Sequence, residues 1–435
     1  YLQPQGATYD GPVRPDKARP QVAFPQTLMS TSAGVAALAQ VGTSPAMKAQ
    51  LPDLARRSLA AAQKGFAYLD KIIAERGAAG TSQHVGRNGE TYDGLDALAW
   101  ATVELFLATG DKALQERLVK TFDPGLTHWG WQRLPEANAR AVRSYAFAAR
   151  SGRRKLEELD PALLARCEKE LRAQGADFAA WARSSAYGTP LPSEARRLRR
   201  LGWYFSSASA FDLSVAALLD DKPELSEAID GAFDYELGEN PLDVTFVTGL
   251  GWKREHVVVS QFAESGRESL PPTGLLVGSV TEGVAWIGLY KREMLDLTWP
   301  FDSDPAAPYP LYDRWTDTFN LSAEGSTFVQ ASSLAAAALR MARSPLAKQA
   351  WRAQPGRIEA SKPLKSGEKI ELKLVAEGLE LSQAQIVWDA QDAAPVFGRT
   401  ATYVPTDAGT HWVEAEAVLP DGRRVMAQVD LVIDR

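Results

Sequence analysis

The chain has 435 residues, 45% of them hydrophobic and 23% charged, which is the composition of an ordinary globular protein and a length typical of two or three domains. No run of about eighteen apolar residues occurs, so no segment is predicted to span a membrane. The formal net charge of -6 argues against a nucleic-acid-binding protein.

The sequence does not indicate a disulfide or a metal centre. Cys167 is the only cysteine, so no internal disulfide can form. Its setting in LLARCEKEL is typical of a packed helix face rather than of a nucleophile. The four histidines, His84, His128, His256 and His411, lack the spacing of zinc ligands. We therefore predict no metal site and no cofactor.

Residues 1–25 are rich in Pro and Gly and predict a loop, after which the pattern becomes helical. The clearest helix starts at Leu51 and has its apolar residues in a 4-3-4-3-4 spacing that Gly77 closes. A second helix starts near Asp96 and ends at Gly110. Further helical stretches are predicted at 112–121, 134–150, 160–184, 203–220 and 223–236, with a last one after Glu324. Because no strand alternation intervenes, these segments predict an array of antiparallel helices.

Two basic clusters interrupt this helical region, at 153–155 and 196–200. The simpler interpretation of each is a solvated helix face. Contact with an anionic ligand is the alternative.

The region 238–322 is long, aromatic and rich in Gly and Pro, and long loops inside a compact domain are usually functional. At its end, Glu324 stands where an aromatic loop becomes a helix. Trp315 and Phe319 are placed to stack on a flat ligand, and Arg314 to bond its edge. A carboxyl group shielded by rings has a raised pKa and suits a general acid. The alternative is a first-turn glutamate favoured by the helix dipole.

The last part of the chain has a different pattern. Residues 346–357 are predicted to form a linker, and from Ile358 the apolar residues alternate with a period of two. Six or seven short strands are predicted, with a hairpin turn at Asp421. Residues 358–435 therefore predict a small all-β sandwich, immunoglobulin-like in outline. Trp388 and Trp412 are interpreted as core residues rather than ligand platforms.

Five segments of the helical region carry motifs. They are FPQTLMSTSAGVAALAQ (24–40), TYDGLDALAWATVELFLATGD (91–111), DYELGENPLDVTFVTGLG (234–251), PPTGLLVGS (271–279) and NLSAEGSTFVQASSLAAAAL (320–339). In this order they resemble glycoside hydrolase family 9, and the third is the most specific match. The resemblance implies an (α/α)6 barrel over residues 1–345, incomplete at its N-terminus, and inverting hydrolysis of β-linked glucans.

By resemblance, Glu324 is the acid that protonates the leaving oxygen. The family's base belongs to a D-A-G-D motif far upstream, which this sequence does not contain. Asp93 and Asp96 match a later motif and are not assigned that role. Fewer helices are predicted here than the family's barrel contains. We therefore expect the base to lie in an upstream segment, and the protein's own N-terminal fragment to be a partner.

The resemblance is weaker at the substrate contacts. Typical cellulases of the family carry a His-His-Arg cluster after the V-T-G-x-G motif, whereas the matching region here is WKREHVVVSQF. His256 stands alone with Arg254 nearby, as a substrate contact or as a structural loop residue. A decorated or acidic exopolysaccharide therefore becomes an alternative to plain cellulose.

Aromatic side chains are further sugar-binding candidates, because the C–H faces of sugars pack on rings. Trp129, Trp131, Tyr204 and Trp252 fall at predicted loop or helix-edge positions. A place in the core is the alternative for each of them.

The sequence thus predicts a cellulase-like hydrolase whose ligand is a polysaccharide or oligosaccharide. The resemblance implies a secreted or periplasmic enzyme, since a polymer substrate normally lies outside the cytoplasm. Structural calcium occurs in such folds, but no dense acidic loop of the EF-hand type is present. The alternative function is a catalytically inactive carbohydrate-binding or scaffolding protein that retains the barrel groove.

Overall fold

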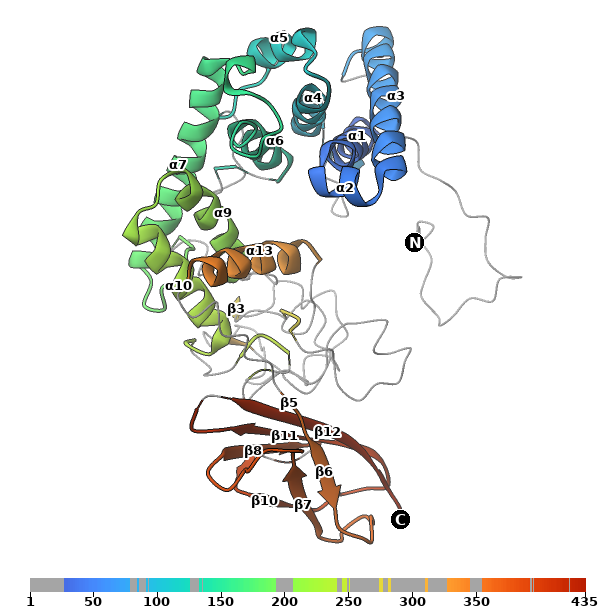
Figure 1. Ribbon diagram of the computed structural model, residues 1–435, viewed down its shortest axis with the longest axis vertical. Coiled ribbons are helices and arrows are strands. Elements are labelled where there is room, and N and C mark those ends of the chain that lie inside the picture. The colour runs from blue at the N-terminus through green and yellow to red at the C-terminus, as the bar shows by residue number, and fades with distance from the viewer. Residues whose placement is uncertain are drawn as a thin grey trace, which may run out of the picture. The chain divides into compact units, whose positions relative to one another are not determined.

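The computed structural model describes the following residues: 27–78, 84–85, 91–92, 94–125, 133–134, 136–192, 206–240, 245–248, 250, 274–276, 281–282, 310–311, 327–344, 354–391, 393, 395–421 and 423–435 (Figure 1). The chain divides into two compact units, residues 1–174 (unit 1) and 175–435 (unit 2). Within the described residues, no helix combines the length and the apolarity needed to cross a membrane.

Unit 1 is helical. Its helices are α1 (Leu28–Thr43), α2 (Pro45–Gln50), α3 (Pro52–Arg76), α4 (Leu95–Thr109), α5 (Lys112–Thr121), α6 (Glu136–Ala146) and most of α7 (Pro161–Arg183), with a short 3-10 turn at Leu156–Glu158. Strands β1 (His84–Val85) and β2 (Thr91–Tyr92) pair antiparallel. Helix α1 packs against α3 and α4, and α4 packs against α6. The helices predicted from Leu51 and from Asp96 are thereby confirmed as α3 and α4.

Helix α4 is the centre of this packing because it is mostly apolar and buried around its circumference. Its buried residues run without a gap from Trp100 to Leu107. A helix that is apolar all round belongs in a core rather than on a surface. Gly110 ends it with a φ of +73°, in the left-handed region that favours glycine after a helix C-terminus.

One carboxylate lies inside this core. The Glu104 side chain is completely buried, and its Oε1 accepts hydrogen bonds from Gln40 Nε2 at 2.8 Å, Trp100 Nε1 at 3.2 Å and the Ser144 hydroxyl. Its Oε2 lies 2.6 Å from a guanidinium nitrogen of Arg153. These five residues, here called the Glu104 network, join α1, α4 and α6 to the segment that follows α6.

The interpretation of 153–155 as a solvated helix face is therefore wrong. The three residues lie in an irregular stretch after α6. Arg153 is the counter-ion of Glu104, and Arg154 donates from Nε to the Leu107 carbonyl at 3.1 Å. The charges of Arg153 and Arg154 are therefore used inside unit 1, whereas Lys155 is exposed. The second cluster, 196–200, lies outside the described residues.

Unit 2 contains the end of α7 and the helices α9 (Ser206–Leu219), α10 (Pro223–Leu237) and α13 (Thr327–Arg343), with the short strands β3 (Thr281–Glu282) and β4 (Pro310–Leu311). Helix α9 lies between α10 and α13 and packs against both (Figure 1). A side chain on Gly175 would collide with Ala216, which explains a glycine where α7 meets α9. The helices predicted at 203–220, at 223–236 and after Glu324 are thereby confirmed.

The C-terminal part of unit 2 consists of two β-sheets. One has the order β10-β7-β6 and the other β5-β12-β11-β8-β9. The strands are β5 (Gln354–Pro355), β6 (Arg357–Ala360), β7 (Ile370–Val375), β8 (Gln385–Ala390), β9 (Val396–Phe397), β10 (Thr400–Tyr403), β11 (Gly409–Val418) and β12 (Arg424–Ile433). β5 and the start of β6 fall within the predicted linker.

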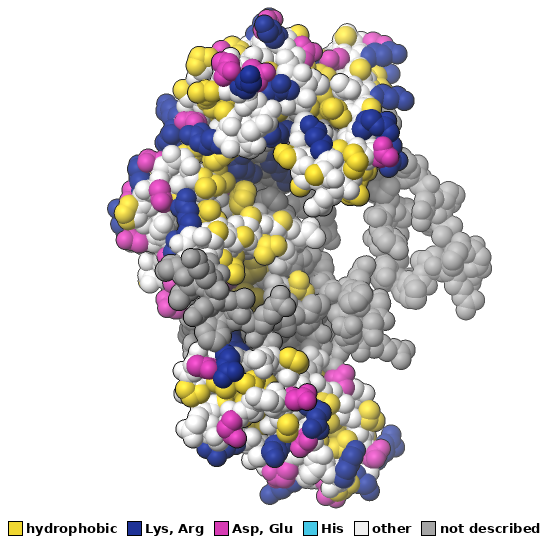
Figure 2. Space-filling view, viewed as in Figure 1, with side chains coloured by type: hydrophobic (Ala, Val, Ile, Leu, Met, Phe, Trp, Pro, Cys, Tyr) yellow, Lys and Arg dark blue, Asp and Glu magenta, His cyan; other side chains and the backbone are white. Residues whose placement is uncertain are grey.

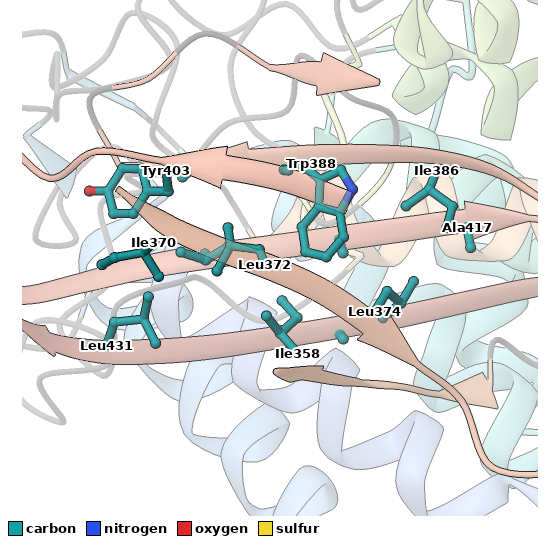
Figure 3. Close-up of a cluster of buried hydrophobic side chains, with 14 of the residues drawn as sticks. Ile358, Ile370, Leu372, Leu374, Ile386, Trp388, Tyr403, Ala417 and Leu431 are labelled. Carbon is teal, nitrogen blue, oxygen red and sulfur yellow. The ribbon is translucent and has the colours of Figure 1, made fainter. Parts of the chain in front are cut away.

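Both sheets contribute to one hydrophobic core (Figure 3). Ile370, Leu372 and Leu374 alternate with exposed residues along β7 and face Trp388 from the other sheet. Trp388 is 2% exposed and its Nε1 donates to the Gly398 carbonyl at 2.8 Å. The period of two and the core position of Trp388 are confirmed. The immunoglobulin-like assignment stays a prediction.

The β11–β12 hairpin confirms the predicted turn at Asp421. Its strands pair from Gly409 opposite Ile433 to Val418 opposite Arg424. Trp412 is buried as expected, although alternation along β11 places it on the sheet face opposite Val413 and the core.

On the face seen in Figure 2, acidic and basic side chains are interspersed rather than gathered by sign.

Candidate functional site

The predicted acid and the predicted sugar contacts all lie outside the described residues. They are Glu324, Trp129, Trp131, Tyr204, Trp252, His256, Arg314, Trp315 and Phe319. The described helix α13 begins at Thr327, three positions after Glu324. The surroundings of this helix start are therefore the part of the predicted site that the structure describes.

The environment of Cys167 does not make its thiol a nucleophile. It is fully buried on α7, as its sequence setting predicts, and burial raises the pKa of its thiol to about 12. A thiol that stays protonated is a poor nucleophile. Among the described residues, no group of three or more His, Cys, Asp or Glu side chains is arranged to hold a metal ion.

Around the start of α13, hydrogen bonds join five segments of unit 2 into a closed circuit. The segments are the first turn of α9, the last turn of α10, residues 245–248, residues 274–276 and the first two turns of α13. We call the circuit the polar ring, made by Glu236, Ser207, Ser333, Gln330, Leu276, Leu275, Gly274, Thr248 and Phe246.

The first side of the polar ring connects three helices. Glu236 of α10 is 1% exposed, and its Oε1 accepts from the backbone N–H of Ser207 at 3.4 Å. That N–H belongs to the first turn of α9, where the helix dipole favours a negative charge and the helix itself offers no acceptor. The hydroxyls of Ser207 and Ser333 lie 2.9 Å apart and link α9 to α13.

Gln330 makes the next connection with a single side chain. Its Nε2 donates to the Leu276 carbonyl at 2.6 Å, and its Oε1 accepts from the Leu276 N–H at 3.0 Å. One carboxamide thus satisfies both backbone groups of a residue, as a neighbouring strand would. Leu276 and Val329 are buried against each other beside these bonds, with Val247 packed on them.

The circuit closes through two short loop segments. Thr248 Oγ1 accepts from the Leu275 N–H at 2.8 Å, and the Thr248 N–H donates to the Leu275 carbonyl at 2.8 Å. The Gly274 N–H donates to the Thr248 carbonyl at 2.8 Å. The Phe246 N–H then donates to the Glu236 carbonyl at 2.8 Å, which returns the circuit to α10. The polar ring therefore fixes where α13 begins relative to both loops.

A perturbed carboxyl group lies near this end of α10. The pKa of Asp234 is raised, first by desolvation and then by the negative charges of Glu239 and Asp230. The backbone carbonyl of Asp234 accepts hydrogen bonds from the N–H groups of Gly238 and Glu239 and so holds the end of the helix. The side chain of Asp234, in contrast, is repelled by the neighbouring carboxylates.

Sequence reasoning did not identify the polar ring. A partial signal was present, because Gln330 and Ser333 are polar residues three positions apart in an alanine-rich helix. Residues at that spacing share a helix face, and in α13 this face also carries the buried Val329 and Ala336.

Comparison with known proteins places the chain in a family of carbohydrate-active proteins. The family model of glycosyl hydrolase family 9 matches residues 7–322, so the chain belongs to that family. The match ends two positions before Glu324. No curated protein sequence matches the chain significantly.

Several solved structures are similar in fold. A metagenome-derived family 9 endoglucanase is 22% identical, with a TM-score of 0.54, covering 72% of this chain and 52% of its own. AaCel9A in complex with cellobiose-like isofagomine is 20% identical, with a TM-score of 0.56 and coverages of 75% and 58%. An endoglucanase from Alicyclobacillus acidocaldarius is 18% identical, with a TM-score of 0.54 and coverages of 74% and 56%. The chain thus spans little more than half of these relatives.

Proposed function

We propose that the protein hydrolyses a β-linked glucan or a related exopolysaccharide with inversion at the anomeric carbon. Glu324 acts as the general acid, and an aspartate upstream of this sequence acts as the base. Membership of family 9 and the similarity to solved endoglucanases support the reaction class. An inverting hydrolase needs the two carboxyl groups about 6.5–9.5 Å apart, on opposite faces of the sugar ring.

The observation that carries the proposal is the polar ring. It joins described residues from three of the family-like segments, 234–251, 271–279 and 320–339, although these lie far apart in the sequence. Segments that are locked together around one helix start form a rigid frame for a site. Glu324 stands three positions before that helix start.

The proposed architecture is an (α/α)6 barrel followed by an immunoglobulin-like module, with the protein's own N-terminal fragment as the partner that completes the barrel. The proposal that another segment completes the barrel is supported by exposed apolar side chains on the face of α13 that does not meet α9. Leu334 is 72% exposed and Met341 65% exposed, in an otherwise alanine-rich stripe. The similar solved structures contain more chain than is matched here, so the proposed N-terminal fragment is a candidate occupant for that face.

The substrate contacts remain those that the sequence suggests. Trp129, Trp131, Tyr204 and Trp252 would supply rings for sugar faces, and the loop before Glu324 would supply Arg314, Trp315 and Phe319. His256 would be a polar contact, and the absence of the family's His-His-Arg cluster around it makes a decorated or acidic exopolysaccharide an alternative to cellulose. A polymer of this kind implies that the enzyme acts outside the cytoplasm, as a secreted or periplasmic protein.

The test is Glu324→Gln in the full-length protein, with product release measured on a panel of β-glucans and the anomeric form of the product followed by NMR. General acid catalysis contributes about 10²–10⁴-fold, so the variant is expected to lose that much turnover. Glu377→Gln, an exposed glutamate of the β region, is the matched control and should change nothing. Near-normal turnover in Glu324→Gln would refute the acid assignment. Oligosaccharide binding without product release would favour the inactive carbohydrate-binding alternative.

A further inference from the structure

We infer that Gln330 is a positioning residue for the acid step: its carboxamide fixes the start of α13 against residues 274–276 and so sets where the carboxyl group of Glu324 stands. This inference rests on the proposed function. It concerns a residue that touches neither substrate nor reacting atoms and acts through the helix that follows the acid.

The geometry gives Gln330 control over position. Two hydrogen bonds from one planar group, at 2.6 and 3.0 Å, fix both the distance and the rotation between α13 and Leu276. Leu276 is 7% exposed, so water is a poor substitute for these bonds. Among the described contacts of α13, no other side chain bonds to 274–276.

The other described polar contacts of α13 cannot replace this control. Ser333 reaches α9 through a single hydroxyl pair. Arg340 and Arg343 form ion pairs with Asp230 and Asp221 at the opposite end of the helix, where the groups are 34–67% exposed. Exposed pairs of this kind contribute little and are screened by salt. Among the described polar contacts, the register of the N-terminal end against 274–276 therefore depends on Gln330.

The chemistry requires a glutamine. The Leu276 carbonyl needs a donor and its N–H needs an acceptor, and the carboxamide offers both at the right spacing. A glutamate of the same shape presents oxygen to the carbonyl when ionised, but regains a donor when protonated. Asparagine has the same groups on a side chain one methylene shorter. Alanine offers neither group.

A small displacement matters because proton transfer to the leaving oxygen depends on reach. A misplacement of about 1 Å can cost about 10²-fold in rate. Gln330 is the fourth residue of α13 and lies six positions after Glu324. When the two Gln330–Leu276 bonds are lost, α13 can slide or rotate on the apolar contact of Val329 with Leu276, and the helix start that follows the proposed acid is displaced.

The experiment compares Gln330→Ala, Gln330→Asn and Gln330→Glu in the full-length protein with two substrates. One is a β-glucan oligosaccharide, whose leaving oxygen must be protonated. The other is a dinitrophenyl β-cellobioside, whose leaving group departs without a proton. Loss of the Gln330–Leu276 bonds should lower kcat for the oligosaccharide about 10²-fold. The kcat for the aryl substrate, and the KM for each substrate, should change less than about threefold. Gln330→Glu should recover towards acidic pH, as its carboxyl group becomes protonated.

Gln115→Ala is the matched control. Gln115 also donates to a backbone carbonyl, that of Glu158 at 2.9 Å, but it lies in unit 1. It should leave both substrates unaffected. Equal slowing of both substrates by Gln330→Ala, or unchanged oligosaccharide turnover in Gln330→Asn, would overturn the inference. If Glu324→Gln is inactive while the Gln330 variants are normal, only the inference fails. If Glu324→Gln is active, the proposed function itself fails.

Discussion

The Glu104 network of unit 1 and the polar ring of unit 2 are both buried, but the first is built around an ion pair and the second mainly from neutral hydrogen bonds. The Glu104 network places a full ion pair between helix α4 and the irregular segment after α6, with the Glu104 side chain fully buried and that of Arg153 16% exposed. The polar ring joins helices to short loops, largely through hydroxyl, carboxamide and backbone groups. Breaking a buried ion pair leaves an uncompensated charge, whereas breaking a neutral bond leaves an unsatisfied dipole, which costs less.

The difference separates two roles. A charge that only one arrangement of helices can satisfy penalises every other packing, so the Glu104 network acts on whether unit 1 folds. The polar ring fixes the positions of segments that carry the family-like motifs, so it acts on how well a site is held. Mutations in the first should therefore appear in stability alone, whereas mutations in the second should lower turnover as well, with a smaller loss of stability.

The largest expected effect is that of Arg153→Met. It leaves the Glu104 carboxylate buried without its counter-ion, and such a loss costs about 3–5 kcal/mol of unfolding free energy. Denaturant unfolding of the full-length protein measures it. Arg56→Met is the control, because the Arg56–Asp53 pair is 74% and 86% exposed and should contribute less than about 1 kcal/mol. Equal effects of the two variants would contradict the distinction between a buried and an exposed pair.

The next largest effect is expected at the Ser207–Ser333 pair of the polar ring. Ser333→Ala leaves the buried Ser207 hydroxyl without its 2.9 Å partner and should cost about 1–3 kcal/mol. The double variant Ser207→Ala with Ser333→Ala removes both polar groups and should cost less than that single change. Thermal or denaturant unfolding of the three variants gives the coupling. Strictly additive losses would mean that the two hydroxyls do not depend on each other.

The sequence predicted the helices and strands whose residues follow one period. The stripe on α3 was visible because Ala55, Ala62, Phe66 and Leu69 repeat on its buried face. Helices α1 and α2 were not predicted as individual elements, since the small residues of α1 give no strong stripe and Ser44 serves as the C-cap of one and the N-cap of the next.

The buried polar networks could not be predicted in the same way. Gln330 and Leu276 lie 54 positions apart, and Ser207 and Ser333 lie 126 apart. Half of each Gln330 bond is a backbone group, which every residue carries and no pattern marks. Arg153 was misinterpreted for a related reason: its partner Glu104 sits inside an apolar helix, 49 positions away, where periodicity shows only a core. The predicted acid itself rests on the family resemblance.

The smallest effect concerns Asp234, a carboxyl group whose neighbours repel it, in contrast to Glu104. Its folded pKa is raised above the ordinary value of 3.8 by desolvation and by Glu239 and Asp230. Below about pH 3.8 the group is protonated in both folded and unfolded chains and costs nothing. As the pH rises through the folded pKa, the charge forms in a place that disfavours it, and the folded state loses stability.

Asp234→Asn should therefore raise Tm above pH 5 and leave it unchanged near pH 3. Because the side chain is exposed, solvent screens the repulsion and the gain is about 1 °C. High salt should reduce it further. Glu239→Gln removes one of the repelling charges, so the double variant should gain less than the sum of the two single gains. Additive gains, or a gain that persists at pH 3, would show that the asparagine stabilises α10 for a reason other than charge. The electrostatic contrast between Asp234 and the paired Glu104 would then be lost.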